Sequence, residues 1–178
     1  MHIFKHFWTI THHRHLVIKY CAKLGIFWQG LLHDLSKYGP TEFFEGAKYY
    51  VGFRSPTEGA RQEHGYSKAW MHHKGRNKHH FEYWTDINNE TRKYEPVKMP
   101  IRYVKEMLAD RMAASKTYLK EKYTDSSPLD YFNSHNARDK MHPDTCNLLE
   151  SWLILLSNEG EKAALKKIKK EFKNKQDY

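Results

Sequence analysis

The sequence predicts an all-α protein, a helical bundle that folds as a single domain. Apolar residues recur every three or four positions through most of the 178 residues, and no stretch keeps the alternation typical of a strand. Hydrophobic residues make up 39% of the chain and aromatic residues 15%, which is enough for a sizeable core. We therefore expect one domain over residues 1–178, with its main motifs at about 10–120 and further helices at 127–175.

Four helices are expected in the first half of the chain. The apolar positions of residues 16–24 predict the first helix, with Gly25 as its C-terminal cap. A second helix is expected over 27–38, where a Gly-Pro pair stops it, and the proline can open a third helix over 40–50. The Ser-Pro-Thr-Glu sequence at 55–58 combines an N-cap, a proline at the first helical position and an early acid. It predicts a fourth helix that runs as far as the histidines at 72 and 73.

The second half of the chain is also expected to be mostly helical. Residues 75–77 break the pattern, and the polar segment 86–99 is compatible with either a strand or a helix. Pro100 can begin a long helix, and Ser-Pro-Leu-Asp at 127–130 repeats the earlier start signal. A leucine-rich helix should then end near Gly160, before a basic amphipathic helix at the end of this chain.

Composition narrows the class of protein without naming a function. The formal net charge of +9 favours anionic partners, among them nucleotides, phosphate esters, nucleic acid and membrane surfaces. Cys21 and Cys146 do not make a disulfide framework, and no CxxC pair suggests a thiolate zinc site, so we expect two reduced, buried thiols. The N-terminal segment lacks signal-peptide features, and the longest apolar run, 152–156, is too short to cross a bilayer. We expect a soluble, cytoplasmic protein without a membrane partner, and its oligomeric state stays open.

The segment "GLLHDLSKYGP" places His33 and Asp34 among leucines that should pack into a core. Burying a carboxylate without a partner costs free energy on the order of several kcal/mol, so something must compensate the charge of Asp34. Three explanations are open: Asp34 is exposed, it pairs with Lys37, or it holds a metal ion.

Other candidate metal ligands cluster at three places. "THHRHLV" contains His12, His13 and His15, and "MHHKGRNKHHFEYW" contains two histidine pairs. Asp110 should lie on the interior side of the long helix. A lone buried histidine is usually a core residue with satisfied hydrogen bonds, but imidazole and carboxylate groups together suit zinc, iron or manganese. A helical bundle can bring such ligands together from several helices. The pairs are His72 with His73 and His79 with His80.

In this order the motifs resemble the HD-domain superfamily of metal-dependent phosphohydrolases. More closely, "HRHLVIKYC", "QGLLHDLSKYGPTEF" and "HHKGRNKHHFEYW" resemble an uncharacterised, mainly bacterial branch known as a domain of unknown function. The resemblance covers roughly residues 10–120 and implies a helical bundle of the HD-domain type. It implies that the metal ligands are His13, His33, Asp34 and Asp110, with further histidines for a second metal. We assign these further ligands to His73 and His79, with His72 and His80 as alternates, and either His12 or His15 as an alternative to His13.

The resemblance implies a phosphohydrolase that acts on a nucleotide or another small phosphate ester through one or two divalent ions (Zn, Mn, Fe or Mg). Asp34 would bridge two ions, and three cations close to the ligands would hold phosphate oxygens: Lys37, Arg76 and Arg111. One alternative keeps the site but makes the protein a di-iron oxygenase. Another is a basic nucleic-acid-binding module without catalysis, suggested by the net charge and the lysine-rich tail. A purely structural metal site is a third alternative.

Overall fold

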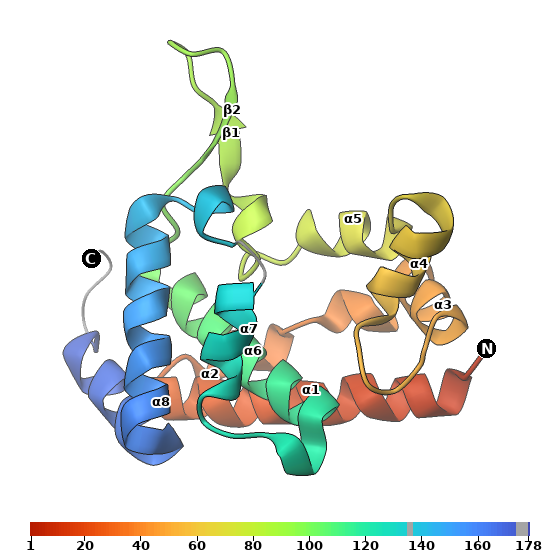
Figure 1. Ribbon diagram of the computed structural model, residues 1–178, viewed down its shortest axis with the longest axis horizontal. Helices are drawn as coiled ribbons and strands as arrows, with labels where there is room; N and C mark the ends of the chain where they lie inside the picture. The colour runs from red at the N-terminus through yellow and green to blue at the C-terminus, as the bar shows by residue number, and fades with distance from the viewer. Residues whose placement is uncertain (135–136, 174–177) are drawn as a thin grey trace.

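The protein is described here by a computed structural model that covers residues 1–134, 137–173 and 178 (Figure 1). It is mainly helical, as the sequence predicts, with short 3₁₀ helices between the α-helices and a single two-stranded sheet in the described part of the chain. The α-helices are α1 (Ile3–Leu24), α2 (Phe27–Leu32), α3 (Pro40–Lys48), α4 (Pro56–His64), α5 (Lys68–Lys74), α6 (Ile101–Leu119), α7 (Ser127–Ser134) and α8 (Pro143–Glu171). The 3₁₀ helices are η1 (Leu35–Tyr38), η2 (Phe81–Tyr83), η3 (Lys120–Lys122) and η4 (Arg138–Lys140).

The core lies where three long helices meet. α1 packs against α6 and α8, and α6 also contacts α7 and α8. In Figure 1, α1 runs along the base of the molecule, α8 stands along one side, and α6 lies in the middle of the view. Fully buried apolar side chains fill this junction, among them Val17, Leu108 and Leu153. Cys21 and Cys146 are buried and unpaired, as expected.

Helix α1 begins much earlier than the sequence pattern indicates. The apolar period predicts a helix over 16–24, whereas the helix starts at Ile3. Its buried face begins with His6, Ile10 and His13 before it reaches Val17, at spacings of four, three and four residues. Because two of these positions carry histidine, an apolar pattern cannot reveal them. The histidines at 12, 13 and 15 therefore lie in the middle of α1, although the apolar pattern starts the helix only after them.

The predicted helix over 27–38 is two shorter elements. α2 ends at Leu32 and η1 begins at Leu35, and the two residues between them are not helical. His33 has an extended ψ of 128°, and Asp34 has a left-handed φ of 53°. Aspartate tolerates the left-handed region better than most residues do. The HD pair thus occupies a break between helices instead of two adjacent positions on one helix.

The predicted helix over 55–73 is also divided. Gly65 ends α4 with a φ of 77°, a conformation that glycine adopts without strain. Ser67 then caps α5, because its hydroxyl accepts a hydrogen bond from the backbone N–H of Trp70 at 3.0 Å. Both signals are present in the sequence, but the strong start at residue 55 and the histidines beyond suggested a continuous helix.

The polar segment after α5 is a β-hairpin that projects away from the helices (Figure 1). β1 (Thr85–Ile87) pairs antiparallel with β2 (Tyr94–Pro96), with Thr85 opposite Pro96 and Ile87 opposite Tyr94. This resolves the choice between strand and helix that the sequence left open.

The C-terminal helices behave largely as predicted. α8 changes direction at Gly160, whose φ of 78° and ψ of 163° are not helical, and then continues as the basic segment. Among the described residues, no helix is both long enough and apolar enough to cross a membrane.

Candidate metal centre

Buried and half-buried imidazole and carboxylate groups from five parts of the chain meet on one side of α6. His13 comes from the middle of α1, and His33 and Asp34 come from the break between α2 and η1. His73 lies near the end of α5. The remaining members are two adjacent histidines in the turn before η2 and Asp110 on α6: His79, His80 and Asp110. We call these seven residues the ligand cluster.

One half of the cluster is formed by His13, His33, Asp34 and Asp110, whose nearest side-chain ligand atoms all lie within 4.8 Å of one another. Nε2 of His13 is 3.0 Å from Oδ1 of Asp110. Nε2 of His33 is 3.1 Å from Oδ2 of Asp34 and 3.6 Å from Oδ1 of Asp110. This set, two imidazoles and two carboxylates, is typical of a divalent-metal site.

The other half is formed by Asp34, His73, His79 and His80, again within 4.8 Å of one another. Oδ1 of Asp34 lies 3.3 Å from Nε2 of His73 and 3.5 Å from Nε2 of His79. Asp34 therefore turns one oxygen towards each half of the cluster. The left-handed backbone at this residue is what places its carboxylate between the two groups.

The polar atoms at the centre of the cluster have no hydrogen-bond partners among the described residues. They are Nε2 of all five histidines and both carboxylate oxygens of Asp34. Leaving so many buried polar atoms unsatisfied would be costly, and native structures contain few such atoms. Their convergence fits one or two divalent cations, which accept lone pairs from imidazole nitrogens and carboxylate oxygens. The side chains of the ligand cluster are therefore chemically suited to bind a divalent metal ion.

Two glutamates hold the histidines from behind. Oε1 of Glu106 is 2.9 Å from Nδ1 of His33 and 3.3 Å from Nδ1 of His79. Oε2 of Glu42 is 2.7 Å from Nδ1 of His73. Metal-binding histidines usually donate their second ring N–H to a carboxylate, which fixes the tautomer and the ring orientation. With Nδ1 as the donor, Nε2 of each ring is left free to bind a cation.

Charge compensation within the cluster is strong. Burial alone would raise the pKa of Asp34, but His33, Lys37 and His73 outweigh it and hold that pKa well below its usual value. Burial would lower the pKa of His33, yet Asp34, Asp110 and Glu106 keep it well above the usual range. Burial and neighbouring histidines lower the pKa of His80. Without a metal, Lys37 and the two histidines whose pKa is raised, His33 and His73, offset the negative charge of Asp34, and a cation would take over that role.

A cavity of about 820 Å³ opens onto the cluster. His13, His73, His80 and Asp110 form part of its wall. One face of α6 forms another part, with residues at helical spacing: Met107, Asp110, Arg111, Ala114, Ser115 and Tyr118. This volume suits a small-molecule ligand.

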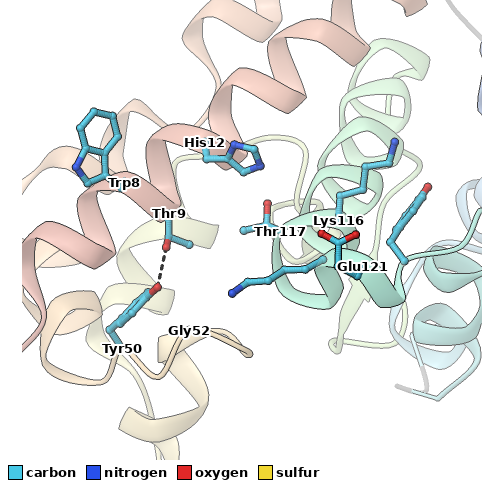
Figure 2. Close-up of a pocket in the computed structure, with 10 residues that line it drawn as sticks. Trp8, Thr9, His12, Tyr50, Gly52, Lys116, Thr117 and Glu121 are labelled. Carbon is cyan, nitrogen blue, oxygen red and sulfur yellow. Dashed lines mark hydrogen bonds between the residues drawn. The ribbon is translucent and has the colours of Figure 1, made fainter.

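A second cavity, of about 670 Å³, lies between α1 and the end of α6. Figure 2 shows Trp8, Thr9 and His12 of α1 on one side of it and Lys116 and Thr117 of α6 on the other. Thr9 and Tyr50 line both cavities, and their hydroxyls are hydrogen-bonded at 2.9 Å (Figure 2). No member of the ligand cluster lines this second cavity, so we assign the candidate site to the larger one.

A sequence profile of a known family matches residues 2–154, which is most of the chain and includes the whole ligand cluster. The chain belongs to DUF5662, a family of unknown function. No curated protein and no solved structure matches it.

The structure of this DUF5662 chain distinguishes between the histidine candidates. His13 is buried in the cluster, whereas His12 and His15 are exposed on α1. His73, His79 and His80 all belong to the cluster, so both members of the second pair are brought together. His72 lies outside the candidate ligand groups, and its Nδ1 is 2.7 Å from Oε1 of Glu42.

The three cations proposed for phosphate binding are placed differently. Nζ of Lys37 lies 2.6 Å from Oδ2 of Asp34, and Lys37 lines the cavity. Arg111 also lines the cavity, stacks over the ring of Phe132 at 5.8 Å and has an Nε without a hydrogen-bond partner. Arg76 is exposed and donates to the backbone carbonyl of His72, so the structure does not bring it to this site.

Glu42 and Glu106 are the residues of the DUF5662 site that sequence reasoning missed. Glu106 could have been found, because it lies four residues before Asp110 and therefore on the same face of α6. Glu42 has no such signal. It lies in the first turn of α3, where an acid is ordinary at a helix start, and only the fold brings it to His73.

Proposed function

We propose that this protein is a metal-dependent phosphohydrolase of the HD-domain type, which acts on a small phosphate ester. The observation that carries the proposal is the set of Nε2 atoms without hydrogen-bond partners that surrounds the carboxylate of Asp34, whose oxygens have ion-pair contacts but no hydrogen bond. The order of the ligands along the chain also supports it. His13, the His33-Asp34 pair, the later histidines and Asp110 follow the order of the superfamily to which the sequence is similar.

Each residue of the cluster has a role that its contacts suggest. Divalent ions, when bound, supply positive charge to a phosphoryl oxygen and lower the pKa of water. Asp34 offers one oxygen to each half of the cluster and so is suited to join two ions. Glu106 and Glu42 orient His33, His79 and His73 through their Nδ1 atoms.

We propose that two cations hold the phosphate group. Lys37 contacts Asp34 and faces the cavity, so it puts a positive charge at the boundary between the ligands and the substrate space. Arg111 follows the ligand Asp110, and its unpartnered Nε gives it a free donor for a phosphate oxygen. We assign binding of the non-bridging phosphate oxygens to these two side chains.

The charges of the cavity wall nearly balance. Its cations are Lys37, Arg54, Arg61, Arg111 and Lys140, and its acids are Glu42, Glu45, Glu58, Glu82 and Asp110. Bound divalent ions would therefore supply the excess positive charge that attracts a phosphorylated small molecule, among which nucleotides are one class.

The deciding experiment measures metal content and phosphate release in the same preparations. We compare the wild type with Asp34→Asn, and use Asp86→Asn on the exposed hairpin as the matched control. The wild type and the control should bind up to about two metal equivalents per chain and release phosphate from 4-nitrophenyl phosphate or nucleoside monophosphates. Asp34→Asn should lose both properties.

Equal metal content in the wild type and Asp34→Asn would overturn the metal site. The histidine-rich ligand set also suits iron. If the protein binds iron, consumes oxygen and releases no phosphate, the same site would instead be that of a di-iron oxygenase.

A further inference from the structure

The outer surface of α1, α2 and η1 carries an unusual number of exposed apolar side chains. Phe4 is 80% exposed and Trp8 is 67% exposed on α1, and Trp28 and Leu32 are 78% and 70% exposed on α2. Phe7, Phe27 and Leu35 are also exposed. We define the α1–α2 face by these seven residues: Phe4, Phe7, Trp8, Phe27, Trp28, Leu32 and Leu35. Clusters of exposed apolar residues on this scale usually mark an interaction surface.

A ring contact joins α1 to η1 beside the face. The ring of Phe7 lies 5.8 Å from that of Trp8 and 5.9 Å from that of Tyr38 on η1. Leu35 and Tyr38 are three residues apart on a 3₁₀ helix, so their side chains lie on the same side. On α2, Trp28 and Leu32 are four residues apart and therefore neighbours on the helix surface. The opposite side of α1 is buried in the core, so the face is held rigidly outward.

The chain segment that carries this face is basic. Between residues 1 and 41 the chain contains a single acid, Asp34, which is buried in the ligand cluster. Lys5 and Lys19 are exposed on α1. Arg14 donates hydrogen bonds to the backbone carbonyls of Leu31 and His33 and thereby fastens the break between α2 and η1 to α1.

We infer that the α1–α2 face docks on an anionic lipid bilayer. Amphipathic helices that combine tryptophan, phenylalanine and leucine with lysine and arginine bind in the plane of the membrane interface. Anionic lipids attract each nearby lysine or arginine, and tryptophan is favoured at the headgroup level. The inference is independent of the proposed hydrolase activity. The expectation of no membrane partner rests on the lack of a spanning segment, which does not bear on adsorption to a bilayer surface.

Charge and side-chain chemistry favour a bilayer over the other occupants of such a face. A symmetric dimer would place this basic surface against itself, and like charges in an interface are unfavourable. Single-stranded nucleic acid uses aromatic platforms for base stacking. Leu32 and Leu35 offer no such platform but partition well into an acyl region.

The test is co-sedimentation of the full chain with vesicles of phosphatidylcholine alone and with vesicles in which phosphatidylserine replaces part of it. The test variant is Trp28→Ser with Leu32→Ser. The matched control is Tyr94→Ser on the hairpin, because Tyr94 is 75% exposed and lies outside the face. Circular dichroism confirms that each protein is folded.

We expect the wild type and the control to bind the anionic vesicles, more weakly as salt is raised, and the double variant to bind about tenfold less or weaker still. Tryptophan fluorescence of the wild type should shift to the blue on binding. The inference is overturned if the wild type stays in the supernatant, or if phosphatidylcholine vesicles bind it equally well. Dimerisation that the double variant abolishes, or RNA binding in place of vesicle binding, would also overturn it.

Discussion

At the residue scale, Asp34 shows why sequence could suggest this site but not describe it. A carboxylate among leucines indicated that something compensates its charge, and buried imidazoles and Lys37 surround it in the structure. Its left-handed backbone could not be foreseen, because the surrounding leucines favour a continuous helix. That backbone is what allows the two oxygens of Asp34 to face different groups of histidines.

Glu106 gives the prediction that belongs to this scale. Glu106→Gln keeps the size of the side chain but removes the charge that His33 and His79 share. We expect metal affinity to fall by about 10- to 100-fold while the fold is retained, because a carboxylate behind a ligand orients the ring and raises its basicity. Competition with a chelating dye measures the affinity.

The matched control for this prediction is Glu90→Gln, on the exposed loop of the hairpin. It should leave the affinity unchanged. An unaltered metal affinity in Glu106→Gln would contradict the prediction, because it would show that Glu106 does not orient His33 and His79 for metal binding.

At the element scale, the sequence predicted which segments are helical better than it predicted where helices divide. The long helix from Ile101 is confirmed, because its apolar positions repeat without interruption. The segments 27–38 and 55–73 each contain a division that a single period cannot show. In the first case, tertiary contacts of the HD pair override local helix propensity. In the second case, Gly65 and Ser67 are a stop signal and a start signal for helices. The strong start at residue 55 and the histidines at 72 and 73 nevertheless favoured one continuous helix.

The contact between α1 and α3 depends on a residue without a side chain. A Cβ atom on Gly46 of α3 would lie 2.4 Å from Nε2 of His6, and His6 is buried against the rings of Phe43 and Tyr50. Because these rings surround the imidazole, it cannot move aside freely. We expect Gly46→Ala to lower the free energy of unfolding by about 1–3 kcal/mol through overpacking. Urea denaturation measures the change.

Gly75→Ala is the control for this prediction. Gly75 has an ordinary φ of −77° at the end of α5, and an added Cβ would meet its nearest neighbour at 3.4 Å. Its effect should stay within about 0.5 kcal/mol. Equal stability of the Gly46→Ala variant and the wild type would show that His6 can be displaced without cost.

At the scale of the whole molecule, Glu161 ties three long helices together. Its carboxylate lies 2.6 Å from Nζ of Lys23 on α1 and 2.6 Å from Nζ of Lys116 on α6, while Glu161 itself follows the kink of α8. Tyr20 adds a hydrogen bond at 3.1 Å. Burial would raise the pKa of Glu161, but the two lysines outweigh it and lower this pKa from 4.5 to about 2.

This network predicts a specific loss of stability in acid. A carboxyl group whose pKa is lower in the folded state stabilises the fold fully above its unfolded value, and the contribution disappears as the pH falls through the folded value. Glu161→Gln should therefore reduce the dependence of stability on pH between about 4.5 and about 2. Thermal unfolding at a series of pH values measures this. Parallel pH profiles for Glu161→Gln and the wild type would contradict the prediction.

The dispersal of the ligand cluster along the chain has a consequence for the order of folding. Its members come from α1, the break after α2, α5, the turn before η2 and α6, so the cluster is incomplete until α1 and α6 have paired. Closing such long loops costs entropy before any ligand contact is gained. An ion held by the full cluster would therefore bind only after α1 and α6 have paired, and it would stabilise the protein mainly by slowing unfolding.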